Sequence, residues 1–291
     1  MEAPKLKDLM EILEEIAPTE LAESWDNSGL QVGFLDQTIE RVALSLDPTL
    51  QAVEYAALHR AQLLLSHHPL IFKPISSIRD GDYPGAVVYE AIRRGLSIVA
   101  MHTNLDAAHE GINTILAALL GLKEIEPLSP GRGGQEAGSS SAAQHPGEKE
   151  EHEEKPPDKT GLGRIGNLSK PCSLSEFIPK AKRLLGLDIL RVVGKASRSI
   201  KRVAVVGGSG GSLIKEAWLR GADLLVTGDV SYHQAREAEF LGLAVIDGGH
   251  FATERVAFRK FGRQLQKEVT TRGWKIEVLF NDKETDPLIP M

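Results

Sequence analysis

The chain has 291 residues, of which 42% are hydrophobic and 25% are charged, so it is long enough for one large or two ordinary globular domains. Its net charge of −6 argues against nucleic acid or an anionic membrane surface as the main ligand. The single cysteine, Cys172, excludes an internal disulfide and a thiolate-rich zinc cluster, and it fits a reducing compartment.

The N-terminal segment MEAPKLKDLMEILEEIAP predicts an amphipathic helix. Apolar residues recur on one face of this helix: Leu6, Leu9, Met10, Leu13 and Ile16. The segment lacks the apolar run and the small-residue cleavage site of a secretion signal. No stretch of the chain reaches the ~20 apolar residues that span a bilayer. We therefore expect a cytoplasmic protein that does not associate with membranes.

Two parts of the sequence resemble each other. Residues 41–66 and 202–227 align without a gap, and each reads as a strand, a turn, a helix and a second strand. A later predicted strand, in residues 95–102, corresponds to residues 242–249. The pattern predicts an α/β fold with two related lobes that arose by internal duplication and have largely parallel sheets. In such sheets, ligands bind beyond the carboxyl ends of the strands.

Residues 129–159 differ from the rest of the chain. They show no periodic apolar positions and are rich in Gly, Ser, Pro and charged residues. Such a segment cannot bury enough apolar surface to offset the entropy lost on ordering. We predict a disordered, low-complexity insert between the two lobes.

The histidines supply the main chemical signal. Two of the nine lie in the predicted insert (His145 and His152), and two others occupy a predicted helix surface and a helix start (His59 and His109). Five remain, and four of them occur just after a predicted buried strand: His67, His68, His102, His233 and His250. A lone histidine at a strand end is more often a hydrogen-bonded core residue than a ligand. Their clustering at matching ends of repeated units favours a metal site.

The spacing of these residues suggests how ions would be held. His250 and Glu254 are four residues apart, so a helix places them on one face. Pro69 favours an extended His68, and neighbours in an extended chain point to opposite sides. His67 and His68 are therefore expected to serve two ions rather than chelate one, with Glu254 or Asp106 as a bridging carboxylate. Imidazole and carboxylate ligands without sulfur suit Zn, Mn, Fe, Co or Ni.

Other polar segments leave alternatives open. Asp229 and His233 either line the site as proton-transfer groups or act as capping or supporting residues. The glycine-rich residues 207–211 either cradle an anion or form a tight turn, and Lys73 is a further candidate for an anion contact. Residues 25–27 (Trp-Asp-Asn) are interpreted as a turn that closes the first lobe, with a role facing the site as the alternative.

Several strings together resemble the Nif-three-like family, whose members are often labelled GTP cyclohydrolase I type 2 homologues. The strings occur in the order of the family's motifs and span the chain except for the insert: SWDNSGLQVG (24–33), SHHPLIF (66–72), MHTNLDAAHEGIN (101–113), TGDVSYH (227–233) and GGHFATER (248–255).

The resemblance implies a centre with two divalent metal ions per subunit. The family's ligand positions correspond to five residues of this chain: His67, His68, Asp106, His250 and Glu254. It also implies assembly into a ring-shaped homohexamer. Because the last two ligands must reach the first lobe, that lobe is expected to be discontinuous. It would comprise residues 1–128 and 245–291, with residues 160–244 as the second lobe.

The same resemblance implies a metal-dependent hydrolase that opens the ring of a purine nucleotide. One alternative is a non-enzymatic metal-binding or regulatory ring whose partners include other proteins. Another is a dinuclear metallopeptidase or phosphoesterase. These classes share the metal centre and differ in the lining of the pocket, which the sequence does not specify.

Overall fold

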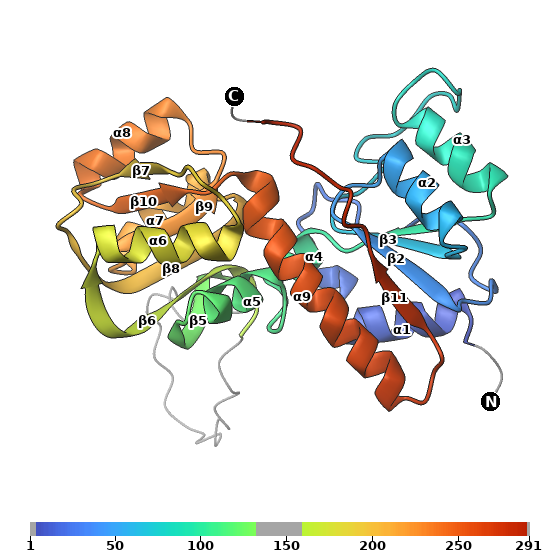
Figure 1. Ribbon diagram of the computed structural model, residues 1–291, viewed down its shortest axis with the longest axis horizontal. Helices are drawn as coiled ribbons and strands as arrows, with labels where there is room; N and C mark the ends of the chain where they lie inside the picture. Colours follow the sequence, from blue (N-terminus) through green and yellow to red (C-terminus); the bar gives the residue numbers. More distant parts are fainter. Residues whose placement is uncertain (1–3, 132–158, 290–291) are drawn as a thin grey trace, which may run out of the picture.

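The computed structural model describes residues 4–131 and 159–289, which form two α/β lobes connected by a long C-terminal helix (Figure 1). The first sheet has five strands in the order β1-β4-β3-β2-β11. The strands are β1 (Gly29–Val32), β2 (Arg41–Ser45), β3 (Leu63–Ser66), β4 (Ser97–Ala100) and β11 (Glu277–Phe280). All neighbours are parallel except β1, which pairs antiparallel with β4 at one edge.

The second sheet has six strands in the order β5-β6-β8-β9-β10-β7, of which β8, β9 and β10 are mutually parallel. The strands are β5 (Lys123–Pro130), β6 (Gly161–Ser173), β7 (Arg191–Val193), β8 (Ser199–Ser209), β9 (Leu224–Gly228) and β10 (Ala244–Asp247). The helices are α1 (Leu6–Ile16), α2 (Leu50–Leu58), α3 (Gly85–Arg93), α4 (Thr103–Ala107), α5 (Ile112–Leu119), α6 (Leu174–Leu185), α7 (Ile214–Leu219), α8 (Tyr232–Leu241) and α9 (His250–Thr271).

Local sequence signals set the ends of several helices. Ser173 begins α6 with a capping box, in which its side chain and that of Glu176 satisfy each other's backbone N–H groups. The same helix ends at Gly186, whose φ of 70° is in the left-handed region that glycine adopts without strain. Ser231 and Gln234 form a second capping box at the start of α8.

One hydrophobic core joins the two lobes. It contains the inward-facing residues of both sheets, such as Leu65 of β3 and Val226 of β9, together with residues of α1, α5, α6 and α9. The outer faces of the sheets are covered separately, by α2 and α3 on the first and by α7 and α8 on the second. Because the central core is shared, the lobes form a single packed unit.

The predicted internal repeat is present in the strand register. Val42 of β2 lies opposite Leu63 of β3, and the corresponding residues Val203 and Leu224 lie opposite each other in β8 and β9. The third strands also agree: β4 pairs parallel with β3 as β10 pairs parallel with β9. The two related α/β lobes expected from the gapless alignment are therefore confirmed.

The first lobe is discontinuous, because β11 near the C-terminus pairs in parallel with β2. Helix α9 crosses from the second lobe to the first and leads the chain back to this strand (Figure 1). The expected boundaries at residues 128 and 245 are corrected in detail. They cut through β5 and β10, which both belong to the second sheet.

The predicted insert, residues 129–159, falls mainly on residues 132–158, which lie outside the described residues. Its first two residues instead end strand β5, and Pro130 pairs with Gly161 of β6. The segment therefore connects two neighbouring antiparallel strands. Among the helices of residues 4–131 and 159–289, none combines the length and apolar character that crossing a bilayer would require.

Candidate metal centre

The candidate site lies where the ends of strands from both lobes meet α9. His67 and His68 follow β3, His102 follows β4, and His250 is the first residue of α9. His68, His102 and His250 line a cavity of about 570 Å³ that also contacts Asp106 of α4, residues of β6 and the 207–213 segment of the second lobe, and His67 is buried beside them. The position agrees with the expectation that ligands gather beyond the carboxyl ends of parallel strands.

A buried carboxylate, Glu254, lies at the centre of the ligand cluster. Its Oε1 lies 3.6 Å from Nε2 of His67, whose Nε2 is 3.8 Å from Oδ1 of Asp106. Its Oε2 lies 3.1 Å from Nε2 of His68 and 3.2 Å from Nε2 of His250. The two oxygens of one carboxylate thus face two different groups of donors. The structure brings together all five residues that the resemblance implied.

Two overlapping groups of side chains have the geometry to hold an ion. In each group the ligand atoms lie within 4.8 Å of one another: His67, His68 and His102 in one, and His68, His250 and Glu254 in the other. His67 and His68 do not point to opposite sides, as the sequence had suggested. Their ring centroids are 5.1 Å apart, because both backbone N–H groups donate to the carbonyl oxygen of Leu46 and bend the chain beyond β3.

Each histidine of the cluster is oriented through its other ring nitrogen. Nδ1 of His67 lies 2.7 Å from the carbonyl oxygen of Met101. The other three pair with carboxylates: His68 with Asp47 at 2.8 Å, His102 with Asp26 at 2.7 Å and His250 with Asp229 at 2.7 Å. An acceptor at Nδ1 fixes the ring and leaves Nε2 as the donor toward a metal, which is the usual arrangement of metal-binding histidines.

Three buried ligand atoms have no hydrogen-bond partner within the described part of the chain that surrounds them. They are Nε2 of His67, Oδ1 of Asp106 and Oε2 of Glu254. Buried polar atoms nearly always have a hydrogen-bond partner, so three unpaired ligand atoms in one cluster require an explanation. Cations bound between the imidazole and carboxylate donors would satisfy all three atoms, and the donor set therefore fits the implied metal.

The electrostatics of the cluster lead to the same conclusion. Burial opposes the charge on the His68 imidazole, but the neighbouring carboxylates of Asp47 and Glu254 prevail and raise its pKa to about 10. The adjacent carboxylate of Glu254 raises the pKa of His250 to about 9. Despite burial, the surrounding imidazoles, His67 first, hold the pKa of Glu254 well below its usual range. The pocket is built to hold positive charge beside Glu254, which protons supply when metal is absent.

The glycine-rich segment makes room for the buried carboxylate. A Cβ atom on Gly208 would lie 2.0 Å from Oε1 of Glu254, and Gly208 also has a φ of +64°. Any larger residue would therefore clash with the central ligand and strain the backbone. Gly207 and Gly208 donate their N–H groups to Asn113 and Thr253, so two amides expected to cradle an anion are already engaged. The tight-turn interpretation fits these two residues better.

A buried arginine fixes the segment next to Asp106. Arg164 of β6 is 1% exposed, and burial lowers its pKa to about 10, so it stays charged near neutral pH. Its guanidinium donates to five carbonyl oxygens and one hydroxyl: those of Lys159, Gly161, Gly163, Ala107 and Ala108 and of Thr114. Two of these carbonyls directly follow Asp106 in the chain. Arg164 thereby ties the second lobe to the loop that presents this carboxylate.

The two candidate proton-transfer residues have different positions. Asp229 pairs with His250, which is the supporting role that the sequence left open. His233 is exposed on α8, stacks edge-on against Tyr232 with ring centroids 5.6 Å apart, and is not among the residues that line the cavity.

Three further residues of the site were not predicted from the sequence: His102 as a ligand, and Asp26 and Asp47 as partners of histidines. The strand-end position of His102 was the available signal.

We expect Asp229→Asn to weaken binding of a divalent ion about 10- to 100-fold, because the variant loses the charged partner that orients His250. Asparagine suits the position, since Asp229 has a φ of 55°, a region that asparagine tolerates. Competition with a chromophoric chelator will measure the affinity. Asp188→Asn, at an exposed site in the second lobe, is the control and should bind normally. Equal affinity of both variants and the wild type would contradict the supporting role.

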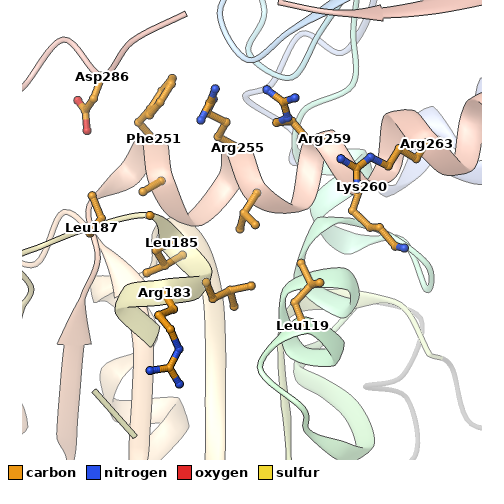
Figure 2. A pocket seen from close by; sticks show the side chains of 14 residues that line it. Leu119, Arg183, Leu185, Leu187, Phe251, Arg255, Arg259, Lys260, Arg263 and Asp286 are labelled. Atoms are coloured by element: carbon orange, nitrogen blue, oxygen red, sulfur yellow. The ribbon is translucent and has the colours of Figure 1, made fainter. Parts of the chain in front are cut away.

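A second cavity, of about 420 Å³, lies along α9 and is lined by Phe251 and Arg255 instead of the ligands His250 and Glu254. Figure 2 shows that its basic side chains diverge: Arg255 and Arg259 extend to one side, and Arg183 points to the other. Arg255 and Arg259 form ion pairs with Glu284 and Asp282. Neither candidate ion-binding group of the described residues lies here.

Comparisons with known proteins agree over nearly the full length. The profile of the family described as Duf34/NIF3 (NGG1p interacting factor 3) matches residues 4–287. The chain is 30% identical to the "GTP cyclohydrolase 1 type 2 homolog" of Clostridium acetobutylicum, over 97% of both chains. It is 31% identical to the protein of that name from Streptomyces coelicolor, over 98% of this chain and 93% of the relative.

Solved structures give the same result. A Bacillus cereus protein related to NIF3 superposes with a TM-score of 0.87 at 28% identity, and a Staphylococcus aureus hypothetical protein superposes with a TM-score of 0.87 at 30% identity. Both superpositions cover 100% of each chain.

Proposed function

The chain belongs to the Duf34/NIF3 family, and from this membership and the geometry of the cleft we propose that it is a hydrolase that works with two divalent metal ions. The observation that carries the proposal is the position of Glu254. Its buried carboxylate faces His67 with one oxygen, and His68 and His250 with the other. A carboxylate shared in this way is suited to bridge two cations.

We assign the ligands by these contacts. One ion would be held by His67, Asp106 and Oε1 of Glu254, and the other by His68, His250 and Oε2 of Glu254. The ligand atom of His102 lies within 4.8 Å of those of His67 and His68, so His102 would be an additional donor. Three orphaned ligand atoms in the cluster support this assignment. With imidazole and oxygen donors and no sulfur, Zn, Mn, Fe, Co and Ni are the candidate ions.

Two such ions would lower the pKa of a bound water from 15.7 toward ~7 and stabilise the oxyanion that forms during hydrolysis. The protein's own residues contribute orientation. Asp47, Asp26 and Asp229 hold the imidazoles of His68, His102 and His250 in fixed positions. Arg164 and the α4 helix hold Asp106. A preformed ligand set binds its ions without the cost of ordering flexible side chains.

The name of the relatives suggests the first substrate class to test. Several are called GTP cyclohydrolase 1 type 2 homologs, so we propose a purine-type ring as the group that is hydrolysed. A second candidate is a regulatory or metal-binding ring protein without turnover, and a homohexamer is the assembly we propose for either. A metallopeptidase or phosphoesterase would use the same ions with a different substrate.

The deciding experiment is to load the protein with Mn, Zn, Co or Fe and to assay GTP and a panel of nucleosides and nucleotides. We expect turnover in the loaded wild type and a loss of at least a hundredfold in His68→Ala, because this variant removes a ligand of one ion and a member of both candidate groups. Metal content and light scattering of each variant show whether the centre and the assembly persist. Tight metal binding with no turnover of any substrate would favour the non-enzymatic alternative.

A further inference from the structure

Two large aromatic side chains stand at the mouth of the metal cleft. Trp25 is 56% exposed and Phe72 is 47% exposed, and both line the cavity that contains the candidate ligands. Neither side chain is needed to fill the hydrophobic cores of the described residues. Ligand-binding cavities are typically lined by aromatic residues with a few polar groups among them.

The two segments that carry these aromatic residues are fixed to each other. The side chain of Asn27 donates to the carbonyl oxygen of Ile71 at 2.6 Å, and Gln31 accepts from the N–H of Ile71 at 3.1 Å. Gln31 in turn donates to the carbonyl oxygen of Asn27 at 2.7 Å. The turn after Trp25 and the segment before Phe72 are therefore held together before any ligand arrives. Such preorganisation lowers the entropy cost of binding.

The aromatic pair also lies directly beside a candidate metal ligand. The ring centroids of Trp25 and Phe72 are 5.7 Å apart with an interplanar angle of 47°. Each ring packs edge-on near His102, at centroid distances of 6.0 Å for Trp25 and 6.3 Å for Phe72. A group bound through an oxygen or nitrogen atom near Nε2 of His102 would have an aromatic surface within reach for its remaining atoms.

The charges of the cleft restrict the ligand further. Among the cavity-lining residues of the described chain there is no lysine or arginine, whereas three carboxylates are present: Glu23, Asp106 and Glu254. Three more carboxylates, those of Asp47, Asp26 and Asp229, pair with the Nδ1 atoms of the cluster's histidines. Together they are enough to balance the charge of two divalent ions. A polyphosphate, which proteins usually bind with arginine and lysine, would find neither of these residues in the described lining of the cavity.

A group of basic side chains lies at the second cavity instead. Arg183, Arg255, Arg259, Lys260 and Arg263 all line the second cavity along α9 (Figure 2). Arg164 is close to Asp106, but its guanidinium is buried and engaged with carbonyl oxygens. None of these basic side chains is among the described residues that line the metal cleft.

We propose that Trp25 and Phe72 form an aromatic ledge that binds a flat ring next to the metal ions. The ligand class is an aromatic or heteroaromatic compound that carries a metal-binding oxygen and has no polyphosphate tail. This inference rests on the proposed metal-dependent function and specifies its substrate. For a purine, it favours the base or nucleoside over the triphosphate.

The ledge can be tested with two chelating probes that differ in their ring. Benzohydroxamate and acetohydroxamate present the same metal-binding group, and calorimetry on the metal-loaded protein measures the affinity of each. We expect benzohydroxamate to bind about 10- to 100-fold more tightly, which is the size of an aromatic stacking contact. The ratio should fall below about threefold in the double variant Trp25→Leu/Phe72→Leu. Phe34→Leu, at an exposed aromatic residue outside the cavity, is the control and should keep the ratio.

Metal content, measured on every sample, separates the possible failures. A wild type that takes up no metal would overturn the proposed function, and this inference with it. A wild type that holds metal but shows the same affinity for both hydroxamates would overturn the ledge alone. An affinity ratio of the two hydroxamates that is unchanged in the double variant would also overturn the ledge. If that variant in addition loses its assembly, the aromatic pair is a contact between copies of the chain.

The charge argument has its own test. Guanosine and GTP, each in excess Mg²⁺, compete with benzohydroxamate for the loaded protein. We expect the triphosphate to add no more than about threefold to the competition, because no lysine or arginine is among the described residues that line the cleft. Competition by GTP that is more than tenfold stronger than by guanosine would show that a phosphate-binding group reaches the cleft, and would overturn this part of the proposal.

Discussion

Glu254→Gln is expected to lower the affinity for divalent ions at least a hundredfold and to leave the purified protein nearly free of metal. Both oxygens of Glu254 face imidazole nitrogens within 3.6 Å, so one substitution alters the ligand set of both proposed ions. Glutamine keeps the volume but removes the negative charge and turns one acceptor into a donor aimed at the ions. Even the loss of an outer partner costs about 10- to 100-fold, and a direct ligand should cost more.

The matched control is Glu268→Gln, which makes the same change on the same helix. The side chain of Glu268 is 41% exposed, and its ion pair within the described residues is with Arg272, so its replacement should leave metal content unchanged. Elemental analysis after dialysis gives metal content, and thermal melting of the metal-free proteins shows whether each variant folds. A folded Glu254→Gln protein that keeps its full complement of metal would refute the central role of this carboxylate.

Arg164→Met should destabilise the protein by about 2–4 kcal/mol, because buried carbonyl oxygens lose their hydrogen-bond donors. Methionine fills much of the space of the arginine stem, so the cost comes from the unsatisfied carbonyls and not from a cavity. Urea unfolding of the metal-free protein measures the change. We also expect weaker metal binding, since two of those carbonyls directly follow the ligand Asp106.

Arg202→Met provides the comparison for this experiment. Arg202 lies on β8, the strand paired with β6, and forms a partly exposed ion pair with Glu126. Pairs of this kind contribute about 1 kcal/mol or less, so this variant should unfold close to the wild type. Similar unfolding midpoints for the two variants would mean that the buried guanidinium is not a major source of stability.

The sequence was sufficient for the architecture because the signals that specify it are periodic and local. The gapless alignment of residues 41–66 with 202–227 predicted two related units, and the strand registers agree with it residue by residue. The boundaries of the two lobes were harder to predict from the sequence. Strand β5 joins the second sheet by pairing with β6 across the segment outside the described residues, and no local pattern records such a pairing.

The site was predictable to the extent that its ligands share a recognisable position at strand ends or a helical spacing. His250 follows a predicted strand, and it shares the helical spacing of four residues with Glu254. For His102 the position at a strand end was the one signal. Its partner Asp26 is far away in the sequence, within a motif interpreted mainly as a turn. The orientation of His67 and His68 could not be obtained from Pro69 alone. It depends on the carbonyl oxygen of Leu46, which draws both backbone amides to one point.

The pairing of Pro130 with Gly161 has a consequence for how this fold can vary. The two ends of the intervening chain are held side by side by the sheet, so its length is nearly uncoupled from the stability of the rest. Closing a loop twice as long costs only about 0.6 kcal/mol more in entropy. Evolution or a protein engineer can therefore exchange this connection for a short turn, a long tether or a whole folded module while the ion-binding cleft keeps its geometry.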